Sequence, residues 1–253
     1  MRKIFVIGIG VGDPDYMTIQ AIKALNQVDV FFIPDKGAEK AALRDLRTTI
    51  CERFIEKADY RTIGVDIPQR ATAGDYLASV DEWHGRLADI YGRLFEHELE
   101  ENEVGALLVW GDPAIYDSTL RIIERVRAKG LALDFQVIPG ISSVQVLAAK
   151  HRIALNQIGE SVLLTTGRRL ADGFPTEFGS VVVLLDGAQT FTRLAGQDLD
   201  IFWGAYLGTE DEILLSGKLA DVKDEIEAVR KRARQQHGWI MDTYLLRKSD
   251  PDR

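Results

Sequence analysis

Short apolar runs alternate with stretches of helical periodicity along the first half of the chain. Ile4–Ile9 is an apolar, largely β-branched run that is typical of a buried parallel strand, and Val28–Ile33 is a second one, which Pro34 is expected to end. Between them, apolar residues recur at helical spacing from Thr18, a suitable N-cap, to Gln27. A strand, a helix and a strand within about thirty residues make a βαβ unit. The pattern therefore predicts an α/β fold with a parallel sheet.

The same alternation continues to the end of the chain. The predicted helices are Glu39–Phe54, Asp75–Glu101, Ser118–Lys129, Ile141–Lys150 and Leu219–Gln236. The predicted strands are Val104–Trp110, Leu133–Ile138, Val162–Thr165, Ser180–Leu185, Ile201–Leu207, Ile213–Ser216 and Ile240–Leu246. One stripe of the long helix at 75–101 is apolar, which favours packing against the core. The stripe consists of Leu77, Val80, Trp83, Leu87, Ile90, Tyr91 and Leu94.

Pro139 and Gly140 interrupt the alternation and mark the predicted domain boundary. We expect an N-terminal α/β domain over residues 1–138, a C-terminal α/β domain over 139–248 that is richer in strands, and a frayed tail over 249–253. The length of 253 residues agrees with this division, because domains commonly contain about 100–200 residues.

Composition narrows the class of protein. The chain has 31 Lys and Arg against 39 Asp and Glu, a net charge of −8, which disfavours nonspecific binding to nucleic acid or to an anionic membrane. The single cysteine, Cys51, cannot form an internal disulfide, which favours a reducing cytoplasm. We expect no membrane span and no signal peptide, because no apolar run approaches the ~20 residues of a span and the first run breaks early at glycines and Asp13.

Neither a metal site nor a hydrolase is predicted. The four histidines (His84, His97, His151 and His237) are scattered, and Cys51 has no partner at the spacing of a zinc site. No Ser–His pair is evident, because Ser142 belongs to the start of a helix.

Three glycine-containing loops follow predicted strands, and each could contact a ligand. The first, Gly8–Pro14, has the glycines of a dinucleotide fingerprint, but its sixth position is Asp13, and Pro14 delays the helix. This spacing does not fit NAD. Asp35, at the end of the second strand, could still imitate the acid that binds ribose. A Rossmann site, a purely structural turn and a loop for a ligand without phosphates all stay open for this segment.

The other two loops contain Asp-Pro and Pro-Gly turns. In Trp110–Tyr116, Asp112 either accepts hydrogen bonds from a ligand or serves the turn before the next helix. In Val137–Ser143, either Ser142 or Ser143 begins a helix. Because open α/β sheets bind ligands at the carboxyl ends of their strands, we expect the three loops to lie along one edge of one sheet.

Taken in this order, the loops resemble the tetrapyrrole (class III) methyltransferases, and the resemblance covers essentially the whole chain. The matching segments are Gly-x-Gly-x-Gly-Asp-Pro from Gly8, Gly-Asp-Pro from Gly111, Pro-Gly-Ile-Ser-Ser from Pro139, and Tyr206–Glu212 followed by Gly217–Leu219. The resemblance implies two α/β domains with a cofactor trough between them. It also implies S-adenosylmethionine as cofactor, held largely by backbone groups, and a homodimer.

The resemblance further implies the cofactor contacts residue by residue. They are Val11, Gly111, Asp112, Ile115, Ser142, Ser143, Asp186, Gly187 and Gly208. Asp112 is expected to reach the ribose or the methionyl amine. Two positions depart from the family pattern, since Val11 stands where many relatives have proline and Asp186 where several have methionine.

Within the family, Trp110–Tyr116 and Trp239–Leu246 look most like the members that methylate C1 of precorrin-5 and release acetate, which gives precorrin-6A in cobalamin biosynthesis. Methyl transfer mainly needs alignment of the two reacting groups. Release of acetate needs water to add to an acetyl carbonyl, and hence a general base or a hydrogen-bond donor. Asp35 and Tyr116 are the catalytic candidates. The candidates for contacts with the substrate are Lys36, Asp117, Arg168 and Arg169.

Other functions stay open at this point. Another precorrin methyltransferase, a diphthine synthase or a ribosomal RNA methyltransferase would share the motifs, although the net charge disfavours the RNA enzyme. An NAD-dependent oxidoreductase would share a doubly wound sheet. A non-catalytic protein would bind S-adenosylmethionine without transferring its methyl group. A conventional seven-stranded methyltransferase would not explain the Pro-Gly crossover.

Overall fold

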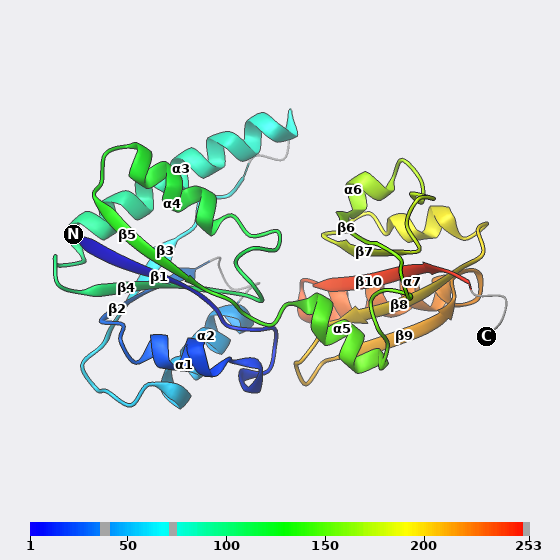
Figure 1. Cartoon of the computed structure of the whole chain (residues 1–253), viewed down its shortest axis with the longest axis horizontal. Helices are drawn as coiled ribbons and strands as arrows, with labels where there is room; N and C mark the ends of the chain where they lie inside the picture. The colour runs from blue at the N-terminus through cyan, green and yellow to red at the C-terminus, as the bar shows by residue number, and fades with distance from the viewer. Residues whose placement is uncertain (36–40, 71–74, 250–253) are drawn as a thin grey trace. The chain divides into compact units, whose positions relative to one another are not determined.

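A computed structural model describes residues 1–35, 41–70 and 75–249 (Figure 1). The chain divides into two compact units, Met1–Ser142 and Ser143–Arg253. Both are α/β, as predicted; the domain boundaries derived from the sequence stay predictions. In the described ranges, no helix combines the length and the apolar character that crossing a bilayer requires.

The N-terminal unit is built on a five-stranded parallel sheet with the order β3-β2-β4-β1-β5. Its strands are β1 (Arg2–Gly8), β2 (Val30–Asp35), β3 (Arg61–Asp66), β4 (Val104–Val109) and β5 (Leu133–Ile138). Since the strands are parallel, their carboxyl ends share one edge of the sheet. The predicted parallel sheet is confirmed.

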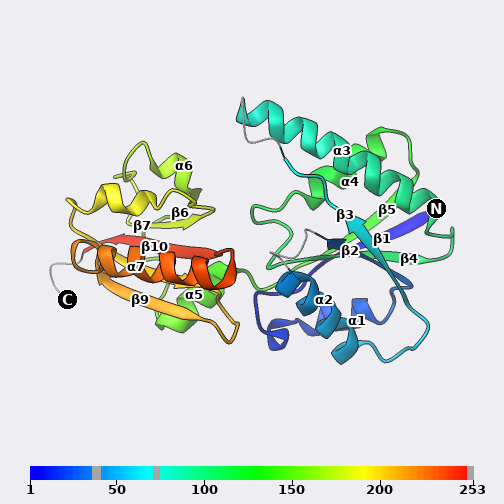
Figure 2. The ribbon, with the colours of Figure 1, turned by 180° about the vertical axis from the view of Figure 1, so that it is seen from behind.

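Four helices cover the two faces of this sheet, and α1 is preceded by the short 3-10 helix η1. The four helices are α1 (Ile19–Leu25), α2 (Ala41–Phe54), α3 (Tyr76–His97) and α4 (Thr119–Ala128), and η1 spans Pro14–Tyr16. Alternate residues of β1 point to opposite faces. Helices α3 and α4 lie on one side of the sheet and α1 and α2 on the other (Figures 1 and 2). Ile4 and Val6 pack in one core with α3 and α4, whereas Phe5 and Ile7 pack in a second core with α1 and α2.

Two sequence predictions in this unit need correction. β2 does not stop before Pro34 but continues to Asp35. Its described pairing with β4 ends at Phe32, so the proline removes no bond to β4. Five residues of the apolar stripe of α3 pack against the core as predicted, namely Trp83, Leu87, Ile90, Tyr91 and Leu94, whereas Leu77 in the first turn is 73% exposed.

The C-terminal unit contains a mixed sheet with the order β6-β7-β10-β8-β9, in which only β6 and β7 pair in parallel. Its strands are β6 (Val162–Thr166), β7 (Ser180–Leu184), β8 (Leu199–Ala205), β9 (Ile213–Lys218) and β10 (Asp242–Lys248). Its helices are α5 (Ser143–His151), α6 (Gly167–Leu170), the 3-10 helix η3 (Thr190–Leu194) and α7 (Leu219–His237). Trp203 and Tyr244 are the largest fully buried side chains of its core.

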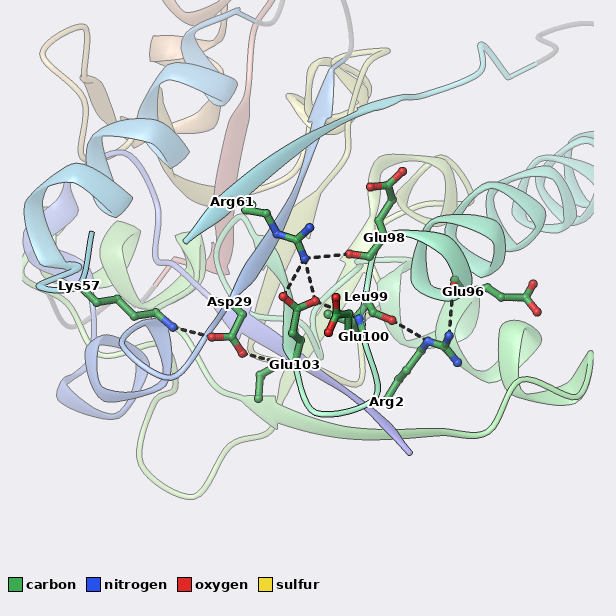
Figure 3. A network of polar contacts seen from close by, with 10 residues as sticks. Arg2, Asp29, Lys57, Arg61, Glu96, Glu98, Leu99, Glu100 and Glu103 are labelled. Atoms are coloured by element: carbon green, nitrogen blue, oxygen red, sulfur yellow. Dashed lines mark hydrogen bonds and ion pairs between the residues drawn. The ribbon is translucent and has the colours of Figure 1, made fainter. Parts of the chain in front are cut away.

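At the amino edge of the N-terminal sheet, polar side chains join the strand ends (Figure 3). Asp29, just before β2, accepts hydrogen bonds from Lys57 Nζ at 2.7 Å and from Val104 N at 2.8 Å. Burial opposes ionisation of Asp29, but these two hydrogen bonds and the positive charges of Lys57 and Arg61 together outweigh it, and the pKa of Asp29 lies below its usual value. Arg61, at the start of β3, binds both carboxylate oxygens of Glu103 at 2.7 and 2.8 Å.

Candidate functional site

The three glycine loops meet at the carboxyl edge of the N-terminal sheet. Gly111 N donates to Gly10 O at 2.8 Å and Gly10 N donates to Gly111 O at 3.3 Å, which joins the first and second loops by an isolated bridge. Gly140 N donates to Asp112 Oδ2 at 2.9 Å, which joins the second and third. The prediction that the loops share one edge of one sheet is confirmed.

These loops approach one another too closely for side chains. A Cβ atom on Gly8 would lie 2.5 Å from Gly140 N, and one on Gly140 would overlap the carbonyl oxygen of Gly111. Gly10 has φ +72°, and a Cβ there would lie 2.7 Å from Tyr16 Cβ. The surface at this edge is therefore made largely of main-chain groups.

Asp112 organises the loop after β4. Its Oδ1 accepts from Ala114 N at 2.8 Å, and its Oδ2 holds the third loop through Gly140. The sequence left open whether Asp112 serves a turn or a ligand, and the structure shows the turn. Because a carboxylate oxygen has a further lone pair, a ligand contact remains compatible with this geometry and stays a prediction.

The neighbouring cofactor candidates differ in exposure. Val11 is buried, Ile115 is half-buried, and a Cβ on Gly111 would be 3.5 Å from Val11 Cγ1. Ser142 is buried, and α5 begins at Ser143, which confirms that one of these two serines begins a helix. Their contacts with a cofactor stay predictions.

Asp35 lies at the carboxyl end of β2, at the same edge of the sheet. Its carboxylate pairs with Arg44 of α2 at 3.2 Å, and its side chain is 40% exposed. A cavity of about 700 Å³ adjoins this pair between α2, β2 and β3, where Cys51 and Tyr60 also line it. Burial raises the pKa of the Cys51 thiol to about 12, so this thiol is not a nucleophile at neutral pH. Lys36 lies outside the described residues.

The loop after β4 presents Tyr116 in a left-handed conformation with φ 49°. The side chain is partly open to solvent, and burial of the rest raises the pKa of its phenol. Next to it, Asp117 Oδ1 accepts from Thr119 N at 2.7 Å and caps the start of α4. A protonated phenol at a strained loop position is suited to donating a hydrogen bond.

Arg47 reaches the same edge from α2, and no pattern in the sequence predicted this. Its Nε donates to Leu108 O at 3.0 Å, beyond the point where β2 and β4 stop pairing. Burial lowers the pKa of Arg47, while the nearby Tyr91 and Asp117 oppose this shift. The guanidinium thus fills the gap that opens between the carboxyl ends of β2 and β4.

The prediction that the chain holds no Ser–His pair was wrong. His84 Nε2 of α3 lies 2.9 Å from Ser118 Oγ, at the start of α4. His84 is 6% exposed and Ser118 is half-buried. Because the two residues belong to different helices and are 34 positions apart, no local spacing in the sequence could reveal them.

In the C-terminal unit, Asp186 is buried just after β7. Its carboxylate accepts from Tyr244 Oη at 2.6 Å, from Thr190 N at 2.6 Å, from Thr190 Oγ1 at 2.9 Å and from Ala188 N at 3.2 Å. The side chain therefore holds the turn between β7 and η3, while Gly187 beside it is exposed. Any contact of Asp186 with a ligand would involve its main chain.

The remaining candidates of this unit occupy exposed or strained positions. Gly208 has φ +78° and donates from its N to Glu212 Oε2 at 2.8 Å. Arg168 and Arg169 lie exposed on α6. Their roles toward cofactor and substrate stay predictions.

The chain matches the family of Tetrapyrrole (Corrin/Porphyrin) Methylases over residues 3–223. It belongs to this family. The "Precorrin-6A synthase [deacetylating]" of Sinorhizobium sp is 54% identical over 250 residues, which are 98% of this chain and 96% of the relative. The "Cobalt-precorrin-4 C(11)-methyltransferase" of Priestia megaterium is 23% identical over 262 residues, which are 96% of this chain and 90% of the relative.

Solved structures of tetrapyrrole methylases have the same fold. A cobalamin synthesis related protein (CobF) from Corynebacterium diphtheriae aligns with a TM-score of 0.84 and 37% identity, over 99% of this chain and all of that chain. Uroporphyrin-III C-methyl transferase from Thermus thermophilus, complexed with S-adenosyl homocysteine, has a TM-score of 0.57 and 18% identity over 96% of each chain. The second likeness concerns the fold alone. The tetrapyrrole methylase fold that the resemblance implied is confirmed.

Proposed function

We propose that the chain transfers a methyl group from S-adenosylmethionine to C1 of precorrin-5 and releases acetate, which forms precorrin-6A in cobalamin biosynthesis. The observation that carries this proposal is the 54% identity, over 98% of the chain, to a relative named precorrin-6A synthase [deacetylating]. The proposal includes a homodimer, which rests on the family resemblance, and a cytoplasmic location, which rests on the single cysteine, Cys51.

The carboxyl edge of the N-terminal sheet has the character that the cofactor requires. S-adenosylmethionine supplies an electrophilic methyl group on a sulfonium, so it needs hydrogen-bonding groups around its ribose and amino acid rather than an anchor for phosphate. The crossing of Gly8, Gly111 and Gly140 leaves main-chain groups and the Asp112 carboxylate at this edge. We assign cofactor contacts to Val11, Gly111, Asp112, Ile115, Ser142, Ser143, Asp186, Gly187 and Gly208.

The chain's own contribution to methyl transfer is positioning. The methyl group and the ring carbon must be held about 3–3.5 Å apart and in line, with water excluded. We assign contacts with the substrate carboxylates to Lys36, Arg168 and Arg169, because arginine and lysine pair with carboxylates. Asp117 belongs to the same proposed surface, next to Tyr116.

Release of acetate is the second half of the reaction. Tyr116 is suited to donate a hydrogen bond to the acetyl carbonyl, since burial raises the pKa of its phenol and keeps it protonated at neutral pH. Asp35 is assigned as a base, held by Arg44 at 3.2 Å. Replacement of Asp35 by asparagine is expected to slow acetate release and to leave binding of the cofactor intact.

Incubation with precorrin-5 and methyl-labelled S-adenosylmethionine tests the proposed function, with ring label and free acetate followed together. We expect one acetate for each methyl group transferred. Ring label without acetate would indicate a different methyltransferase of the pathway. If no label enters the ring while the protein binds S-adenosylhomocysteine, the chain is a binding protein and the proposal is wrong.

A further inference from the structure

A hydroxyl and an imidazole lie within hydrogen-bonding distance beside the proposed catalytic loop. Ser118 Oγ lies 2.9 Å from His84 Nε2. Ser118 ends the loop that begins after β4 and carries Asp112 and Tyr116, whereas His84 comes from α3 on the same face of the sheet as α4. A nucleophile and a base at 2.6–3.2 Å are the geometric signature of an activated nucleophile.

The Ser118 hydroxyl does not cap α4, although Ser118 stands at the N-cap position of that helix. Ser118 occupies the N-cap of α4, where a serine usually accepts a hydrogen bond from an amide of the first turn. Among the described residues, its side chain makes no such capping bond. Asp117 takes over this role through its bond from Thr119 N at 2.7 Å. The Ser118 hydroxyl therefore faces the histidine instead of the helix.

The state of His84 is suited to accept a proton. Burial lowers the pKa of His84, and the nearby Arg125 and Arg121 lower it further, while Asp81 opposes them. The ring is then neutral at pH 7. In the tautomer that carries the proton on Nδ1, Nε2 accepts the hydrogen bond from Ser118.

We propose that Ser118 is the nucleophile, and His84 its general base, in removal of the acetyl group. The inference rests on the proposed function, because the deacetylating reaction supplies that group. Ser118 Oγ bonds to the acetyl carbonyl carbon, the bond from this carbon to the ring breaks, and its electron pair passes into the conjugated ring. The serine proton moves to His84 Nε2 and later to solvent, while the electron pair left on the ring forms the bond to the methyl group of S-adenosylmethionine. Water, with Asp35 as the base for this second step, then hydrolyses the acetyl-serine ester, which releases acetate and restores the hydroxyl.

A single-turnover reaction separates this role from a structural bond between α3 and α4. With precorrin-5 and methyl-labelled S-adenosylmethionine, Ser118→Ala and His84→Gln are expected to slow acetate release at least about 100-fold. Labelling of the ring is expected to fall with it, because the methyl group enters at the carbon that loses the acetyl group, whereas affinity for S-adenosylhomocysteine is expected to stay within about threefold of the unchanged protein. Acid quenching of the unchanged protein should trap an acetyl group on the peptide that contains Ser118, as detected by mass spectrometry.

Matched variants on α3 serve as controls. Ser79, which is half-buried, and His97, which is exposed, belong to the same helix, and Ser79→Ala and His97→Gln should release acetate at the unchanged rate. Ser118→Cys keeps a nucleophile of similar size and should retain acetyl transfer to the side chain if Ser118→Ala fails to fold.

Two results would overturn the inference. One is acetate release at the unchanged rate in Ser118→Ala or, where that variant fails to fold, Ser118→Cys that labels the ring and carries no acetyl group after quenching. The other is acetate release by the unchanged protein with no acetyl group on the Ser118 peptide at any quench time, which would make the pair structural. If the unchanged protein labels no ring, the proposed function is wrong, and this outcome is distinct from both.

Discussion

The two edges of the N-terminal sheet are held together by different means. At the amino edge, charged side chains bridge the strand ends, as Asp29 does with Lys57 and Arg61 with Glu103 (Figure 3). At the carboxyl edge, main chain meets main chain, as at Gly10 and Gly111. Long charged side chains can rearrange after a substitution, and exposed ion pairs are worth only about 0–1 kcal/mol. Two backbones in contact cannot rearrange, so the edge that carries the proposed site should tolerate the least change.

The largest effect is expected from Gly140→Ala. The new Cβ would overlap the Gly111 carbonyl oxygen and would crowd the main chain of Gly8, so the third loop must move. We expect a loss of about 2–4 kcal/mol in the free energy of unfolding. Affinity for S-adenosylhomocysteine should also fall. Chemical denaturation and calorimetry measure the two effects.

Gly64→Ala is the matched control in the same sheet. No described atom lies within 4 Å of a Cβ placed on Gly64, which belongs to β3. This change should leave stability within about 1 kcal/mol of the unchanged protein or increase it slightly. If both substitutions cost the same, the close approach of the loops is not what makes the carboxyl edge sensitive.

The second largest effect on stability is expected from Asp112→Asn. Asp112 accepts main-chain hydrogen bonds from Ala114 N at 2.8 Å and from Gly140 N at 2.9 Å. An asparagine must present its NH₂ group to one of these donors, so one bond is lost and a donor is left facing another. The expected cost is about 1–3 kcal/mol in the free energy of unfolding. A variant as stable as the unchanged protein would show that the second and third loops are held by other contacts.

The sequence predicted the carboxyl edge better than the amino edge, and the reason is physical. A backbone crossing requires glycine, so Gly8, Gly111 and Gly140 mark it in the sequence in chain order. Networks of charged side chains require no particular residue type at a given position, because many charged residues can form ion pairs at an exposed edge, so the sequence does not reveal them. β3 was missed for a related reason, since Ile63 and Val65 are the only apolar residues of the strand to face the core.

The pairs that the sequence missed join elements far apart in the chain. Ser118 and His84 come from two helices whose relative rotation depends on how each packs on the sheet. The sequence could not connect Asp186 with Tyr244 either, because Tyr244 lies 58 residues away on β10. Local patterns specify the helices and strands, whereas such contacts depend on the packed core.

Asp29 offers a smaller effect that depends on pH. Asp29 accepts a main-chain hydrogen bond at the amino edge of the sheet, as Asp112 does at the carboxyl edge. The donor to Asp29 is Val104 N, at 2.8 Å. Since the pKa of Asp29 is lowered on folding, the carboxylate stabilises the fold above its unfolded pKa of about 3.9, and this contribution is lost as the pH falls through the lower folded value. Asp29→Asn should cost about 1 kcal/mol at pH 7.

The pH dependence of the cost of Asp29→Asn tests whether folding lowers the pKa of Asp29. The difference in unfolding free energy between Asp29→Asn and the unchanged protein, measured with urea, should be constant from pH 7 to about 5 and shrink below about 3.9. A difference that grows as the pH falls would contradict the lowered pKa of Asp29.

The smallest effect is expected at Arg61 and Glu103. The pair is bidentate, with both oxygens of Glu103 within 2.8 Å of one Arg61 nitrogen, but the Arg61 side chain is 50% exposed. Water competes for both charges, so the coupling free energy from a double-mutant cycle of Arg61→Ala and Glu103→Ala should stay below about 1 kcal/mol and decrease with added salt. A coupling as large as the cost of Gly140→Ala would mean that both edges are equally sensitive, and the contrast between them would no longer hold.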